Sequence, residues 1–162
     1  MNPALGQLIA VLRAQADSLE QALDLTERQT DAIVRRELDR INTLSQSLEH
    51  EVVEGRKLEE RRHGFAAELA DALGMEPGES TLSMLASALP RSEANALLRA
   101  GETVIRSIEK LARRSVANRQ LLEHELAVID QVMRIAHRGD RSTYAGTGTY
   151  SESPIAILDA RA

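Results

Sequence analysis

Residues 69–80 read LADALGMEPGES, and this stretch separates two long segments of helical pattern. Gly74 supplies the left-handed conformation that commonly follows the last turn of a helix. Pro77, with Gly78 directly after it, lacks the N–H group that a continuing helix requires. The stretch therefore predicts that one helix ends here and that the chain turns before the next helix begins.

The segment before this turn, residues 3–73, carries an apolar stripe with the spacing of one helical face. The stripe consists of Leu5, Leu8, Leu12, Leu19 and Leu23, followed by Ile33, Ile41, Leu44, Leu48, Val52 and Leu58. Residues 26–31, TERQTD, weaken the pattern between the two runs. We therefore expect one long helix with a kink or a brief break at residues 26–31.

Two further helices are predicted after the turn. A short helix starts at the N-cap Ser80 and ends before Pro90, with Leu82, Leu85 and Leu89 on its apolar side. A second long helix starts at the N-cap Ser92 and ends at Gly139. Its apolar positions are Leu97, Leu98, Val104, Ile108, Leu111, Leu122, Ile129, Val132 and Ala136.

Two long amphipathic helices joined by a compact turn bury their apolar stripes against each other. The predicted fold is all-α: an antiparallel hairpin of long helices, or coiled-coil bundle, with a short third helix near the bend. Residues 1–138 form the predicted helical domain. Residues 139–162 are rich in Gly, Ser and Thr at their start and are expected to form a flexible C-terminal tail.

Composition narrows the classes of function. The chain has 162 residues, a formal charge of −5 and no cysteine, so disulfide and thiol chemistry are absent. The acidic balance argues against nucleic-acid binding, and no apolar run reaches the roughly 20 residues that span a bilayer. The first residues lack a basic segment, and Arg13 interrupts them early, so we expect a cytoplasmic protein without a secretory signal.

The sequence motifs that are typical of metal sites and catalytic sites are incomplete in this chain. His124-Glu125 begins an H-E-x-x-H motif, but Val128 occupies the position of the second histidine. Glu60 and His63 have the Glu-x-x-His spacing of di-iron bundles, which need two such motifs, and the chain has one. We therefore expect no catalytic residue, no metal site and no cofactor. A metal-binding four-helix bundle made from two hairpins is the enzymatic alternative, which metal analysis would test.

Polar residues interrupt the apolar seam of the last helix. Ser115 and Asn118 occupy positions where the seam predicts apolar side chains. A buried polar residue at such a position can fix the register of packed helices. Alternatively, the seam is under-packed because this helix accepts a helix of another protein. The residues alone leave both interpretations open.

The tail contains both tyrosines of the chain, in residues 139–151, GDRSTYAGTGTYS. A tyrosine offers a large amphipathic contact at a small cost in side-chain entropy. We interpret the tail as a docking segment. The alternative is that Tyr144 packs back on the helices.

Residues 118–123, NRQLLE, are followed by an amphipathic run to Ile135 and then by residues 143–148, TYAGTG. This order resembles the FlgN-like family of flagellar export chaperones. That family has an Asn-x-x-Leu-Leu-like stretch, a helix of similar length and a Thr-Tyr-Gly-x-x-Gly-like turn in its tail. The chain departs from the pattern at Ala145, where the family tends to place Gly.

The resemblance implies a cytoplasmic chaperone without catalytic activity. It would bind hook-associated proteins of the FlgK and FlgL type, which form the hook–filament junction, prevent their premature assembly and deliver them to the flagellar type III export apparatus. The expected substrate-binding residues are Asn118, Leu121, Leu122, Leu126 and Ile129. The expected contacts with the export gate are Tyr144, Gly146 and Gly148. The non-chaperone alternative is a generic coiled-coil scaffold or dimerisation protein, and the sequence leaves open whether the chain is a monomer or a homodimer.

Overall fold

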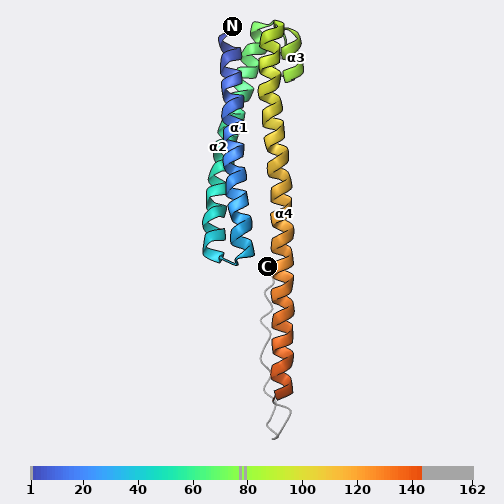
Figure 1. Cartoon of the computed structure of the whole chain (residues 1–162). Helices are drawn as coiled ribbons and strands as arrows, with labels where there is room; N and C mark the ends of the chain where they lie inside the picture. Colours follow the sequence, from blue (N-terminus) through green and yellow to red (C-terminus); the bar gives the residue numbers. More distant parts are fainter. Residues whose placement is uncertain (1, 77, 79, 144–162) are drawn as a thin grey trace, which may run out of the picture. The chain divides into compact units, whose positions relative to one another are not determined.

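The computed structural model describes residues 2–76, 78 and 80–143, with side chains described as far as residue 137. These residues form four helices and no strand: α1 (Pro3–Val34), α2 (Leu38–Ala72), α3 (Leu82–Ser87) and α4 (Arg91–Thr143) (Figure 1). The all-α class predicted from the sequence is confirmed. The chain divides into two compact units, Met1–Glu123 and His124–Ala162.

A three-residue turn at residues 35–37 connects α1 to α2. Arg36 adopts the left-handed conformation with φ of 59°. The N–H of Arg36 donates to the carbonyl of Ile33 at 3.0 Å, and the N–H of Glu37 donates to the carbonyl of Ala32 at 2.9 Å. These two bonds satisfy the last carbonyls of α1 in the way a helix-ending glycine usually does. The chain therefore reverses direction at once.

This turn corrects the prediction of a single long helix over residues 3–73. Residues 26–31, where a kink or break was expected, lie inside continuous α1, and the Thr26 hydroxyl donates to the Ala22 carbonyl at 2.7 Å. The reversal occurs after Val34 instead. This reversal could not be predicted from the sequence, because the left-handed position is occupied by an arginine rather than by Gly or Asn.

The end of the second helix lies where the sequence predicts it. α2 ends at Ala72, and Gly74 is left-handed with φ of 69°. The N–H of Gly74 donates to the Asp71 carbonyl at 2.9 Å, and the N–H of Met75 donates to the Ala70 carbonyl at 2.8 Å. The predicted stop at Leu73-Gly74 is confirmed.

The boundaries of the last two helices differ slightly from the predicted ones. Thr81, rather than Ser80, caps α3, because its hydroxyl accepts a bond from the N–H of Met84 at 3.2 Å. α4 begins at Arg91, so the predicted cap Ser92 lies within its first turn. Its helical backbone continues through Gly139 to Thr143, because a single glycine weakens a helix without ending it.

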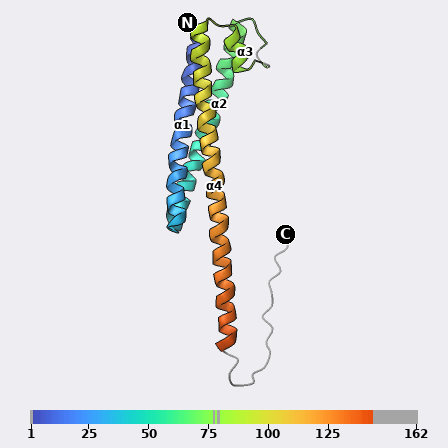
Figure 2. The same cartoon turned by 45° about the vertical axis from the view of Figure 1, so that its right-hand side comes forward.

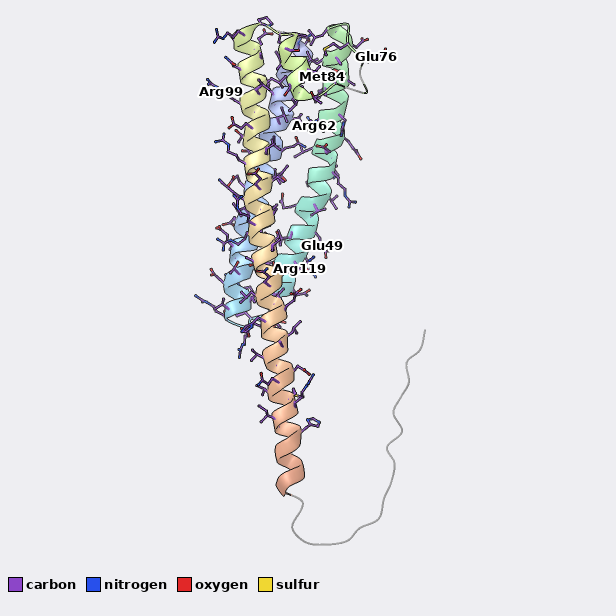
Figure 3. The ribbon with its side chains drawn as sticks, turned by 90° about the vertical axis from the view of Figure 1, so that its right-hand side faces the viewer. Glu49, Arg62, Glu76, Met84, Arg99 and Arg119 are labelled. Carbon is purple, nitrogen blue, oxygen red and sulfur yellow. The ribbon has the colours of Figure 1, made fainter. Side chains whose placement is uncertain are left out.

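The apolar core of the first unit lies where the start of α1, the end of α2, α3 and the start of α4 meet (Figures 1 and 2). Its fully buried large side chains are Leu5, Leu8, Leu12, Leu69, Leu85 and Leu97. Burying one such side chain contributes roughly 1.5–3 kcal/mol. Figure 3 shows Met84 of α3, Glu76 after α2 and Arg99 of α4 at this same end.

The three long helices run up, down and up. α1 and α2 are antiparallel, since Gln15 contacts Glu59 while Gln29, farther along α1, contacts the earlier Ser45. α1 and the first part of α4 are parallel, because hydrogen bonds join successive residues in the same order along both helices. These pairs are Glu20 with Ser107, Glu27 with Arg114 and Thr30 with Asn118.

The predicted antiparallel hairpin of two long helices is therefore a bundle of three long helices. The predicted first helix is two helices, α1 and α2, and the last long helix runs parallel to the first of them. The extra reversal at residues 35–37 changes the direction of everything that follows it. The short helix near the second bend, α3, lies where it was expected.

Candidate functional site

α4 leaves most of its large apolar side chains exposed. Leu97 is the one buried hydrophobic residue of α4 among the described side chains. Leu98, Ile108, Ile129 and Val132, all expected to face the hairpin core, are between 41% and 58% exposed. The prediction that the whole apolar stripe of the last helix is buried is therefore wrong. A periodic stripe shows which residues share a face, but it does not show that another helix covers that face.

In the second unit, a run of exposed apolar side chains lies on one face of α4. Leu126, Ile129 and Met133 are separated by three and four residues and are 64%, 51% and 55% exposed. We call these three residues the C-terminal stripe. Side chains at this spacing lie above one another on a helix. They form an apolar surface that another amphipathic helix can cover.

Asn118 lies inside the bundle of the first unit rather than on its surface. It is 4% exposed, and its Nδ2 donates to the carbonyl of Thr26 at 2.9 Å. The hydroxyl of Thr30 donates to its Oδ1 at 2.6 Å. Because both ends of the amide are bonded to α1, this residue fixes how α4 and α1 align. The interpretation of Asn118 as a register-setting residue is favoured, whereas Ser115 is exposed.

The other predicted binding residues are distributed differently. Leu121 and Leu122 are half-buried, and Leu126 and Ile129 are exposed. The predicted tail contacts Tyr144, Gly146 and Gly148 lie outside the described residues. Met133 was not predicted as a binding residue, although it follows Leu126 by seven residues, a spacing that places the two on the same face.

A polar cluster joins α1 to α2 around Glu59. The Nε2 of Gln15 donates to the Glu59 carboxylate at 2.8 Å, and the Nε of Arg62 donates to it at 2.9 Å. These bonds, with that from Arg62 the strongest influence, lower the pKa of Glu59 to about 2. His63 lies 3.0 Å from the same carboxylate. The histidine of the Glu60-x-x-His63 pattern therefore contacts Glu59, in a cluster that ties two helices together.

The described side chains do not include a candidate metal site. No group of three or more His, Asp and Glu residues that could hold a metal ion occurs among them.

An open groove of about 890 Å³ runs between α1 and α2, and it is lined mainly by polar side chains. The lining residues are Glu20, Gln21, Asp24, Leu25, Thr43, Gln46, Ser47, His50 and Glu51. Leu25 is the only apolar residue of this lining, whereas α4 carries several exposed apolar side chains.

The exposed apolar side chains on α4 are those that a helix-binding protein requires. The family model described as FlgN protein matches residues 1–152 of this chain. The chain belongs to the FlgN family. Membership in the FlgN family, a chaperone family, supports a role as a flagellar export chaperone. Comparison with curated proteins and with solved structures finds no match.

Within the part of the chain that the structure describes, none of the helices combines the length and hydropathy that crossing a bilayer requires. The apolar side chains of α4 are separated by charged residues such as Asp130 and Arg134, which form an ion pair at 2.6 Å. The apolar surface of this FlgN family member is therefore one face of an otherwise polar helix.

Proposed function

We propose that this FlgN family member binds hook-associated proteins of the FlgK and FlgL type in the cytoplasm. It prevents their premature assembly and delivers them to the flagellar type III export apparatus. The observation that carries this proposal is the C-terminal stripe of Leu126, Ile129 and Met133, which is exposed on a helix of a flagellar chaperone family. We use the word client for the hook-associated protein that it binds.

The C-terminal stripe suits a client that presents an amphipathic helix. Such a helix lays its own apolar face along another helix, with anchors at every third or fourth residue. Covering a large apolar side chain stabilises a complex by roughly 1.5–3 kcal/mol before the cost of ordering both partners. Three adjacent anchors can therefore support a reversible complex. Reversible binding is what a chaperone that releases its client needs.

Among the residues predicted from the sequence, we assign the client contact to Leu126 and Ile129, with Leu121 and Leu122 at its edge. Asn118 is buried against α1, so we assign it to the alignment of the helices. The docking of the loaded chaperone at the export gate is assigned to Tyr144, Gly146 and Gly148. The support for this second assignment is the resemblance of residues 143–148 to the tail motif of the family.

The client contact is tested with the variant Leu126→Asp/Ile129→Asp. Both side chains are exposed, so the charges leave the core of the first unit intact. We expect the variant to keep its helicity and to lose binding of the FlgK-type and FlgL-type proteins from the same genome, measured by calorimetry. Val116→Asp is the matched control, because Val116 is an exposed apolar residue of the same helix.

Normal client binding by the double variant would overturn the assignment of the client contact. The same experiment also tests the scaffold alternative. If the native chain is a homodimer that the double variant converts to a monomer, and client binding is absent from both, the C-terminal stripe is a dimerisation surface. Light scattering provides that measurement.

A further inference from the structure

The bundle of the first unit is held together differently along its length. Its apolar cluster extends to Leu12 on α1, Leu58 on α2 and Val104 on α4. Beyond these residues α1 and α2 still bury apolar side chains, namely Ala16, Ala22, Ala32, Ile33 and Leu44. After Val104, the buried residues of α4 are Ser107 and Asn118, and both are polar. We call this part of the bundle, beyond Leu12, Leu58 and Val104, the polar half. Here α1 and α2 pack apolar side chains against each other, and α4 contributes no buried apolar side chain.

Polar contacts connect α4 to α1 in this polar half. The Ser107 hydroxyl donates to the Glu20 carboxylate at 2.9 Å, and Lys110 lies 3.6 Å from the same group. Arg114 donates to Glu27 at 3.3 Å, and the side chains of both are more than 40% exposed. Water can replace the ion pairs of Lys110 with Glu20 and of Arg114 with Glu27 at little cost, because exposed ion pairs contribute little to stability. Ser107 and Asn118 are themselves buried, and the bond from Asn118 to the Thr26 carbonyl is shielded from solvent.

Separation of α4 from α1 would uncover an apolar strip. Leu19 and Leu23 precede Thr26 and Thr30 by seven residues, so they lie on the face of α1 that meets α4. Leu111 lies between Ser107 and Asn118 at spacings of four and seven, on the opposing face of α4. All three leucines are half-buried. They are spaced as anchors for a second amphipathic helix.

We propose that residues 107–123 of α4 form a latch that separates from α1 when the client binds. The client's helix then contacts Leu19, Leu23 and Leu111, while Leu97 keeps the start of α4 in the apolar core. The identity of the client rests on the function proposed above. The hydrogen bonds of Asn118 to α1 keep the latch closed and in register until the client's helix takes the place of the latch.

Opening of the latch can be measured without a client. The chain has no cysteine, so a single introduced thiol reports its own accessibility. Ser107→Cys is nearly isosteric and lies at the start of the latch, buried against α1, whereas Ala70→Cys lies in the apolar core and Ala22→Cys lies in the hairpin of α1 and α2. We expect a maleimide reagent to label the Ser107→Cys thiol at least about tenfold faster than either control, because locally weak regions open more often.

Equal labelling rates in Ser107→Cys and a folded control would overturn the latch. Circular dichroism establishes that each variant is folded, and either control alone is sufficient for the comparison. Faster labelling of Ser107→Cys than of Ala22→Cys would show that α4 opens while the hairpin of α1 and α2 stays closed.

The link between opening and binding is tested by closing the latch covalently. Glu27→Cys with Arg114→Cys places two thiols at an exposed contact between α1 and α4. A short bis-maleimide joins them, and the same variant capped with N-ethylmaleimide is the matched control. We expect the joined protein to bind the FlgK-type protein at least about tenfold more weakly than the capped protein, since Leu19, Leu23 and Leu111 stay covered.

Equal binding by the joined and capped proteins would overturn the latch as part of client recognition. If the native and capped proteins both fail to bind any hook-associated protein, the proposed function is wrong. The thiol labelling rates decide in that case whether α4 opens. The two proposals therefore fail by different measurements.

Discussion

Arg36 adopts a backbone conformation that glycine usually occupies. The reversal between α1 and α2 depends on this conformation. Its φ of 59° lies in the left-handed region, which costs residues with a Cβ roughly 1–2 kcal/mol. The neighbouring Arg35 has φ of −84° and is right-handed. We therefore expect substitution by glycine to change the stability of the fold in opposite directions at these two adjacent arginines.

We expect Arg36→Gly to stabilise the fold by about 0.5–1 kcal/mol and Arg35→Gly to destabilise it by a similar amount. Glycine relieves the left-handed strain at the first position and only adds chain entropy at the second. Urea unfolding followed by circular dichroism measures both. A loss of stability in both variants would show that Arg36 carries little strain.

Glu59 makes stability depend on pH. Its pKa is lowered to about 2 from the ordinary value of 4.5, chiefly because Arg62 hydrogen-bonds the carboxylate. The ionised group therefore stabilises the fold above pH 4.5, and this contribution is lost as the pH falls from about 4.5 to about 2. Because the Glu59 side chain is 46% exposed and solvent screens its contacts, we expect Glu59→Gln to lower the unfolding free energy at pH 7 by no more than about 1 kcal/mol.

The difference between the native chain and Glu59→Gln should shrink toward zero at pH 2, where the carboxyl group begins to be protonated in the folded protein as well. Urea unfolding at pH 7 and pH 2 gives the comparison. Glu60→Gln, an exposed neighbour, serves as the control. A difference that stays constant over this pH range would contradict the role of the Glu59 carboxylate.

At the scale of the elements, the long helices contain glycines with different surroundings. A Cβ added at Gly64 of α2 would meet no atom within 4 Å. A Cβ added at Gly101 of α4 would lie 2.8 Å from the Leu82 Cδ1 of α3. Gly101 therefore lets α3 pack closely against α4, whereas Gly64 only weakens its helix.

We expect Gly64→Ala to stabilise the protein by about 0.5–1 kcal/mol, which is the difference in helix propensity. Gly101→Ala has the same gain in propensity, but the Leu82 side chain must move, so its net gain should be smaller or negative. Thermal unfolding of the two variants makes this comparison. Equal gains would show that α3 moves aside freely.

At the scale of the whole molecule, recognition of the client and recognition of the export apparatus are assigned to different parts of the chain. The client contact proposed above includes residues of α4, and Tyr144 follows the last residue of that helix in the sequence. The two roles can therefore be separated by substitution, because a side chain that serves only docking contributes little to folding or to client binding.

We expect Tyr144→Ala to change stability by less than about 0.5 kcal/mol and to leave client binding intact. Export should fall, because loss of an aromatic anchor can cost roughly 2 kcal/mol of docking energy, about thirtyfold in affinity. Secretion of the FlgK-type protein into the medium is the measurement, and Tyr144→Phe tests whether the hydroxyl contributes. A large drop in melting temperature for Tyr144→Ala would show that the ring packs on the helices instead.

The helical class, the stop at Leu73-Gly74 and the short helix that follows could all be predicted from the order of the residues. Each of these has a local cause, since periodicity, a left-handed glycine and a cap act through neighbouring residues. Leu126 and Ile129 were also predicted as binding residues, because their spacing and the resemblance to the family depend only on the sequence.

Three features became apparent from the three-dimensional structure alone: the reversal at residues 35–37, the parallel direction of α1 and the first part of α4, and the side of α4 that is covered. The reversal depends on Arg36, whose type carries no turn signal. Asn118 became a buried contact and Leu126 an exposed one although both lie in the same helical pattern. The physical reason is that a stripe states which side chains share a face, whereas burial depends on which other helix lies against that face.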